Sequence, residues 1–158
     1  HLLPQMEVTV DQALQQGIAA HKEGKLQDAE RLYRAILQAQ PKHPDANHNL
    51  GVLAVAVGKP LKAIPLLKLA LAANPRIDQF WLSYGDALIK VERFDDARRV
   101  LAGAQQAGVT AAKLRTFREQ LEFELSPDSD APQQEFGNKL PSHQDELSPA
   151  IELREVGK

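Results

Sequence analysis

Residues 81–88 read Trp-Leu-Ser-Tyr-Gly-Asp-Ala-Leu, and the glycine of this stretch, Gly85, recurs along the chain. Gly17, Gly51 and Gly85 are equally spaced. Three alanines keep the same interval, at Ala29, Ala63 and Ala97. A period of about 34 residues means that each unit is one supersecondary element that cannot bury its apolar side alone, so neighbouring units must stack. The spacing therefore predicts a repeat array that presents a binding surface rather than a reaction centre.

The repeat register gives three units with two helical patterns each, over residues 10–43, 44–77 and 78–111. In the first unit, Thr9 and Gln12 form a T-x-x-Q capping box, which opens a helix that ends near Gly24. A second helix is predicted from about residue 26 to residue 39, because its apolar residues follow the spacing of one helical face. Pro41 ends this helix. Each unit is therefore predicted to be a helical hairpin.

The second and third units repeat the hairpin with different turn residues. Their turns are expected at Gly58 and at Glu92. Pro60 suits the first position of a helix, but Pro65 lies about five residues further on, where a proline costs on the order of 3 kcal/mol in a regular helix. The sequence therefore predicts a kink or a late helix start there. Gly108 is expected to end the last helix of the third unit.

These residues resemble the tetratricopeptide repeat, whose pattern is an aromatic residue, Leu-Gly and Tyr in the first helix, then Ala, Phe and a closing Pro. The third unit carries the matching residues Trp81, Tyr84, Gly85, Leu88, Ala97 and Leu101. The second carries Leu50, Gly51, Ala54, Ala63, Leu67 and Pro75, with Asn47 at the aromatic position. The first carries Ala13, Gln16, Gly17, Ala20, Ala29, Tyr33 and Pro41. The resemblance implies an all-α fold, an α-solenoid of three hairpins.

The C-terminal third departs from the repeat. Thr110 can cap a further helix over residues 111–124, which we expect to cap the third unit. Residues 125–146 have the composition of a linker, and residues 147–158 resemble the start of another such hairpin. We expect residues 126–158 to dock on a protein surface, either their own array or a second copy of the chain. Residues 1–5 are interpreted as a vector remnant, and the array as part of a longer, bacterial-type protein.

Composition excludes several classes of function. The chain of 158 residues has 19 Lys and Arg against 21 Asp and Glu and no cysteine, so it lacks a thiolate nucleophile and a cysteine-bound metal. No basic stripe attracts nucleic acid, and the longest apolar run, residues 50–57, is too short to span a bilayer. We therefore expect no nucleic-acid or membrane partner and a cytoplasmic protein.

No motif of an enzyme or a metal site is present. The histidines are not spaced as metal ligands, and the glycines are not clustered as in a phosphate loop. Asp95 and Asp96 lie at a helix start, where they complement the helix dipole. The sequence thus predicts no catalytic residue, no metal and no cofactor.

The resemblance implies that the first helices of the units line a concave groove for a peptide or a helix. The positions that carry over are Leu14, Ile18, His21, His48, Asn49, Val52, Val55, Leu82, Ser83, Asp86 and Ile89. Apolar anchors with a few polar groups suit such a ligand. The alternative for Val52, Val55 and Ile89 is packing between adjacent helices.

Relatives that bind the acidic C-terminal tails of heat-shock chaperones use a clamp of Lys, Asn and Arg. The matching positions here are Leu14, Ile18, Asn49, Gln79 and Ser83, so only the asparagine is retained and the cations are missing. The sequence therefore predicts a non-enzymatic scaffold that binds another protein or peptide. The alternative is the N-terminal region of a bacterial glycosyltransferase-, sulfotransferase- or hydroxylase-type enzyme, which would present substrate or self-associate.

Overall fold

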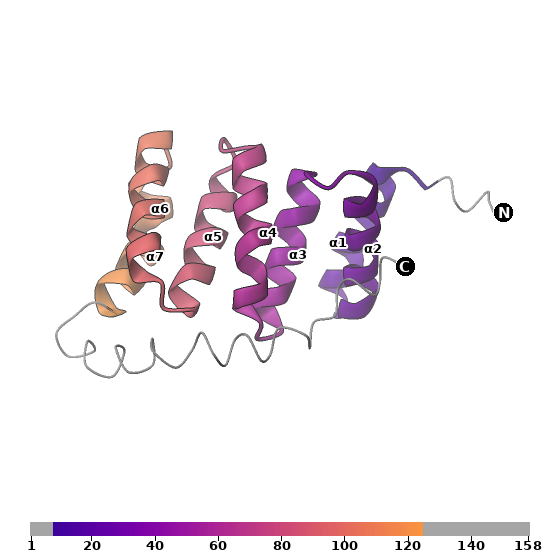
Figure 1. Ribbon diagram of the computed structural model, residues 1–158, viewed down its shortest axis with the longest axis horizontal. Coiled ribbons are helices and arrows are strands. Elements are labelled where there is room, and N and C mark those ends of the chain that lie inside the picture. Colours follow the sequence, from indigo (N-terminus) through magenta and orange to yellow (C-terminus); the bar gives the residue numbers. More distant parts are fainter. Residues whose placement is uncertain (1–7, 125–158) are drawn as a thin grey trace.

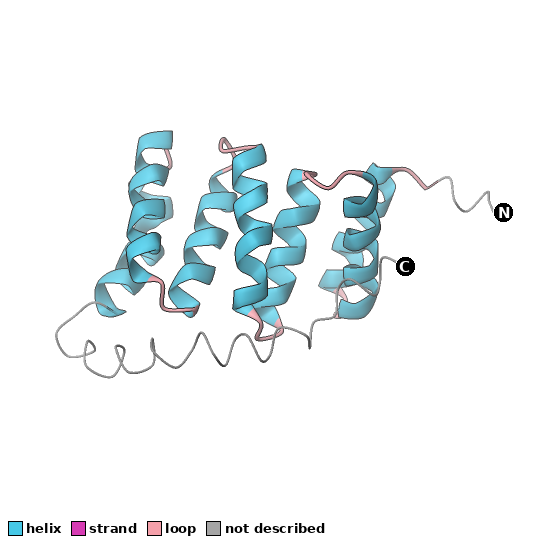
Figure 2. Cartoon of the chain, in the orientation of Figure 1, coloured by secondary structure: helices cyan, strands magenta, loops and turns pink. Residues whose placement is uncertain are grey.

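The computed structural model describes residues 8–124, which form helices connected by short turns, with no strand among them (Figures 1 and 2). The helices are α1 (Val10–Lys22), α2 (Leu26–Ala39), α3 (Pro44–Ala56), α4 (Pro60–Ala73), α5 (Asp78–Lys90), α6 (Phe94–Ala107) and α7 (Ala111–Glu124). The predictions for residues 1–5, 125–146 and 147–158, including docking of the tail, lie outside the described residues.

The hairpins follow one another in chain order, from α1 and α2 at one end of the molecule to α6 and α7 at the other (Figure 1). Consecutive helices pack as antiparallel neighbours, and α1 also contacts α3, α3 contacts α5, and α5 contacts α7. The chain is therefore an α-solenoid of three hairpins followed by one further helix, as the sequence predicts. None of the helices within residues 8–124 combines the length and the hydropathy that crossing a bilayer requires.

The ends of the helices follow the predicted signals with one exception. Thr9 and Gln12 form the complete capping box of α1, and Gly108 ends α6 in a left-handed conformation with φ of 101°. Of the two outcomes predicted at Pro65, a kink or a late helix start, the late start is wrong, because α4 begins at Pro60 and continues through Pro65. The ring of Pro65 lies on the exposed side of α4. Pro60 stands at the first helical position, where its fixed φ favours the helical conformation, so α4 has already begun before Pro65.

The repeated alanines lie where helices pack against one another. Ala29, Ala63 and Ala97 are each 0% exposed, so a larger side chain there has no room. Two apolar clusters form around them. One, the N-terminal cluster, contains Tyr33 and Ile36 with residues of α1 and α3, and the other, the C-terminal cluster, extends from α3 to α7.

Asn47 takes over a hydrogen bond that the aromatic residue makes in the next unit. The indole Nε1 of Trp81 donates to the carbonyl oxygen of Pro75, six residues earlier, at 2.8 Å. Asn47 is 1% exposed, and its Nδ2 donates to the carbonyl oxygen of Pro41, also six residues earlier, at 3.0 Å. A buried side-chain amide needs a hydrogen-bond partner, and the loop before α3 supplies one here. Asparagine can therefore replace the aromatic residue of the family pattern at this position.

Candidate functional site

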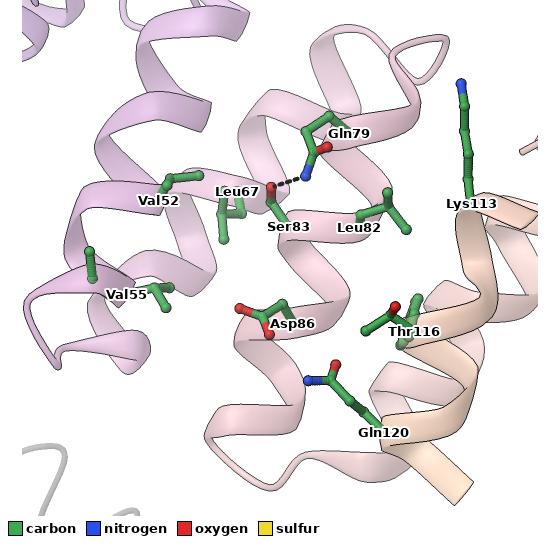
Figure 3. A pocket seen from close by; sticks show the side chains of 12 residues that line it. Val52, Val55, Leu67, Gln79, Leu82, Ser83, Asp86, Lys113, Thr116 and Gln120 are labelled. Carbon is green, nitrogen blue, oxygen red and sulfur yellow. Dashed lines mark hydrogen bonds between the residues drawn. The ribbon is translucent and has the colours of Figure 1, made fainter. Parts of the chain in front are cut away.

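A groove of about 540 Å³ opens between α3, α5 and α7 (Figure 3). We call it the α3/α5/α7 groove. Its walls are formed by Val52, Val55, Ala56, Leu67, Gln79, Leu82, Ser83, Asp86, Lys113, Thr116, Phe117 and Gln120. Helix α3 contributes only apolar side chains, whereas α5 and α7 each add one apolar side chain together with amide, hydroxyl and charged groups.

Helix α5 forms the middle of the groove. Gln79, Leu82, Ser83 and Asp86 follow one another at the spacing of adjacent helical turns, so they lie on a single helical face. The Nε2 of Gln79 donates to the Oγ of Ser83 at 3.2 Å, as Figure 3 shows. One face of α5 therefore presents an ordered pair of polar groups beside the methyl groups of a half-buried leucine.

Helix α7 forms one wall and is fixed to α5 by packing and by charge. Phe117 lies against Gly85, where a Cβ atom on residue 85 would overlap the phenyl ring. The Nζ of Lys113 lies 2.7 Å from Oδ2 of Asp78 at the start of α5. The hydroxyl of Thr110 accepts a hydrogen bond from the backbone of Lys113 at 3.3 Å, which caps the helix. The glycine of the repeat thus allows α7 to approach closely enough to form the groove.

The charged groups of the groove have partners within the chain. Asp86 pairs with Lys90 one turn further along α5, at 2.7 Å. Lys113 pairs with Asp78, as described above. Both pairs are exposed, so each contributes well under about 1 kcal/mol to stability and can exchange for a charge on a ligand.

His48 lies behind the groove and joins α3 to α5. Its Nε2 is 2.8 Å from the Oγ of Ser83, and its ring stacks on Phe80 with the ring centroids 4.7 Å apart. Its Nδ1 is 3.0 Å from Oδ1 of Asn49. Burial lowers the pKa of His48 from its ordinary value, while the hydrogen bond to Asn49 and the charge of Asp45 act in the opposite direction.

The hydrogen-bond chain continues away from the groove. The Asn49 side chain also hydrogen-bonds to the hydroxyl of Tyr33 on α2, which is buried in the N-terminal cluster. Burial raises the pKa of Tyr33, so this hydroxyl stays neutral at physiological pH. The polar side chains from Gln79 to Tyr33 therefore form one connected network across three helices.

Two models of the tetratricopeptide repeat match the chain, one over residues 14–56 and the other over residues 54–121. Together they span α1 to α7 almost completely. The chain belongs to the tetratricopeptide repeat family. A comparison with curated proteins finds no significant match.

Solved tetratricopeptide structures share the fold. The TPR2B domain of yeast Sti1, in a complex with an Hsp70 peptide, matches with a TM-score of 0.67 and 15% identity over 73% of this chain and 97% of that one. The first tetratricopeptide domain of Spaghetti, bound to an HSP90 peptide, matches with a TM-score of 0.65 and 18% identity over 74% and 96%. MamA from AMB-1 matches with a TM-score of 0.64 and 28% identity over 85% and 74%. None of these three is described as a glycosyltransferase, sulfotransferase or hydroxylase, so the comparisons give no support to the enzyme alternative.

The structure brings five of the predicted site residues together in the α3/α5/α7 groove, namely Val52, Val55, Leu82, Ser83 and Asp86. His48 and Asn49 lie next to them, in the network behind Ser83. Ile18 and His21 are half-buried on α1, outside the walls of this groove. Leu14 and Ile89 are both 8% exposed and belong to the two apolar clusters, so they pack between helices rather than offering a surface.

Sequence reasoning missed the wall that α7 provides. Lys113, Thr116, Phe117 and Gln120 each lie one repeat interval after Gln79, Leu82, Ser83 and Asp86. Continuing the tetratricopeptide register by one more helix would have found all four. The sequence predicts for this helix only the role of a cap on the third unit.

No group of three or more potential metal-ligating side chains gathers anywhere in the part of the chain that the structure describes. What the groove presents there is hydrogen-bonding and apolar surface.

Proposed function

We propose that the chain is a protein-interaction module that binds a peptide or helical segment of another protein in the α3/α5/α7 groove. The observation that carries this proposal is the groove itself, which is open, has apolar and polar side chains in its walls, and is not filled by any side chain of residues 8–124. Its size of about 540 Å³ lies in the range of ligand-binding clefts.

The chemistry of the groove favours a segment with apolar anchors and a few polar groups. Val52, Val55 and Leu82 offer methyl groups, while Gln79, Thr116 and Gln120 offer donors and acceptors for a backbone or side-chain amide. Apolar burial supplies affinity, and the polar groups set the register of the ligand. Sti1 and Spaghetti hold peptides on the same fold, so the fold itself is compatible with this role.

A peptide library displayed on phage tests the proposal when it is selected on the full chain. We expect enriched sequences, and we expect Val52→Glu to weaken their binding at least about tenfold, because a carboxylate replaces an apolar wall. Val57→Glu is the matched control, since Val57 is 45% exposed at the end of the same helix and outside the groove.

Circular dichroism on both variants separates loss of binding from loss of folding. If Val57→Glu weakens binding as much as Val52→Glu, the ligand lies elsewhere. If Val52→Glu unfolds the protein, Val52 is a packing residue, and Thr116→Glu on the opposite wall, where the side chain is exposed, replaces it as the test.

A further inference from the structure

We propose that His48 and Ser83 make the α3/α5/α7 groove sensitive to protons, so that protonation of His48 turns the Ser83 hydroxyl into a donor for a carboxylate on the bound segment. The inference rests on the proposed binding function and adds the chemistry and the regulation of the ligand. His48 is a positioning residue here, because it reaches the groove only through Ser83.

The donors and acceptors of the network fix the proton positions in the neutral state. Oδ1 of Asn49 can only accept, so the Nδ1 of His48 carries the proton that it shares with Asn49 at 3.0 Å. The Nε2 of a neutral ring is then an acceptor, and its partner at 2.8 Å is the Ser83 hydroxyl. Ser83 in turn accepts from Nε2 of Gln79. The Ser83 proton therefore points away from the groove.

Protonation of His48 reverses one of these bonds. The charged ring donates from both nitrogens, so Nε2 now donates to the Oγ of Ser83. This oxygen has two lone pairs and accepts from both His48 and Gln79. Its own proton is no longer needed by the ring and turns toward the groove that Ser83 lines. A neutral network thus presents no hydroxyl donor to a ligand, whereas a charged one does.

The charge also selects what the donor meets. The protonated His48 ring would be two hydrogen bonds away from the ligand, through the Ser83 hydroxyl. Its positive charge favours a carboxylate over an amide of the same shape. The charged group that acts on the ring is Asp45 on α3, and Tyr33 on α2 lies beyond Asn49. On α5, Asp86 lies three residues after Ser83 in the groove and pairs with Lys90. Asp86 lines the groove and would repel a ligand carboxylate, but Lys90 neutralises it and Lys113 lies on the facing wall.

The effect operates on the acid side of neutrality. Burial lowers the pKa of His48, so the ring is neutral near pH 7 and takes up its proton as the pH falls further. A ligand that prefers the protonated ring must raise the pKa of His48 when it binds, because the coupling between ligand and proton is reciprocal. A carboxylate-bearing segment should therefore bind more tightly at acidic pH.

The first experiment needs no ligand. Nuclear magnetic resonance of the ¹⁵N-labelled full chain, with the His48 ring assigned by its absence in His48→Gln, reports which ring nitrogen carries the proton at about pH 7.5. We expect the Nδ1–H form. The Nε2–H form would overturn the proposal, because Ser83 would then be free to donate in the neutral state.

The second experiment selects the same peptide library at about pH 5 and about pH 7.5, where Asp and Glu side chains remain ionised. We expect the acidic selection alone to enrich Asp or Glu, and the enriched peptides to bind at least about fivefold tighter at the lower pH. His48→Gln and Ser83→Ala should each remove this dependence, whereas His21→Gln on α1 should keep it.

The outcomes separate the two proposals. Identical peptides at both pH values, or a pH dependence that survives His48→Gln, would overturn the proton switch and leave the binding function standing. A library without enrichment at either pH would overturn both. If His48→Gln fails to fold, Ser83→Ala decides, because its side chain lies at the groove surface and its loss leaves the His48 and Phe80 stack in place.

Discussion

The backbone turns left-handed at the same position in each of the three hairpins. Gly24 and Gly58 have φ of 80° and 83°, and Glu92, at the equivalent position of the third unit, has φ of 62°. A left-handed conformation costs roughly 1 kcal/mol for a residue with a Cβ atom and nothing for glycine. Two turns are therefore relaxed, and the turn of the third unit holds strain.

Gly58→Ala should destabilise the protein by about 1 kcal/mol. A Cβ atom on residue 58 meets no other atom within 4 Å, so the cost comes from the backbone alone. Chemical denaturation measures it. Equal stability of Gly58→Ala and the parent chain would show that this turn adapts without strain.

His48 should make the stability of the fold depend on pH. Its pKa is lower in the folded chain than its ordinary value of 6.5, so the unfolded chain binds more protons and stability rises with pH. Stability should therefore be complete above about pH 7 and fall as the pH drops below 6.5 toward the folded pKa. The denaturation midpoint of His48→Gln should fall less over this range than that of His21→Gln. Parallel curves for the two variants would contradict this assignment.

At the level of helices, the close crossing of α5 and α7 determines whether one wall of the groove exists. In the first two units the glycine faces Tyr33 or Leu67 of its own hairpin, but Gly85 faces Phe117 of α7. The same repeat position therefore serves packing within a unit twice and packing between units once. This difference follows from which large side chain the neighbouring helix supplies.

Gly85→Ala should cost about 1 to 3 kcal/mol, because its methyl group overlaps the Phe117 ring and pushes α7 outward. Adding Phe117→Leu should recover part of this loss by removing ring atoms from the crossing. Denaturation of the two single variants and the double variant gives the coupling between them. Additive losses would mean that α7 does not lie on Gly85.

The helices could be predicted from sequence more completely than the groove. Caps and turn residues are local signals, and they predict the helix ends. Pro65 wrongly predicted a late helix start, because the packing of α4 and its start at Pro60 outweigh the cost of a proline inside the helix. The groove depends on which side chains several helices leave uncovered. Sequence could assign Leu14 and Ile89 to the groove side of a helix, but not reveal that neighbouring helices cover them.

Across the whole molecule, the two apolar clusters differ in size and in how they are supported. The N-terminal cluster is smaller and includes several alanines, and its helices α1 and α2 pack mainly on each other and on α3. The C-terminal cluster adds Phe117 and the partly buried Trp81, and its helix α5 contacts α3, α4, α6 and α7. In a solenoid, stability is close to a sum of unit and interface contributions, so the two ends need not unfold together.

Hydrogen exchange under native conditions should therefore find amides of α1 and α2 exchanging about tenfold faster or more than those of α5, through an opening that leaves the rest folded. The α3/α5/α7 groove belongs to the C-terminal cluster, so its walls should stay in place during this opening. Val52 and Val55 on α3 pack against that cluster, while Leu50 and Leu53 on the same helix belong to the other. The first turn of α3, which carries Ala46 of the N-terminal cluster, should thus exchange with α2, and its last two turns, which carry Val52 and Val55, with α5. Uniform exchange across all helices would instead mean one cooperative unit, in which any loss of stability in the first hairpin also opens the groove.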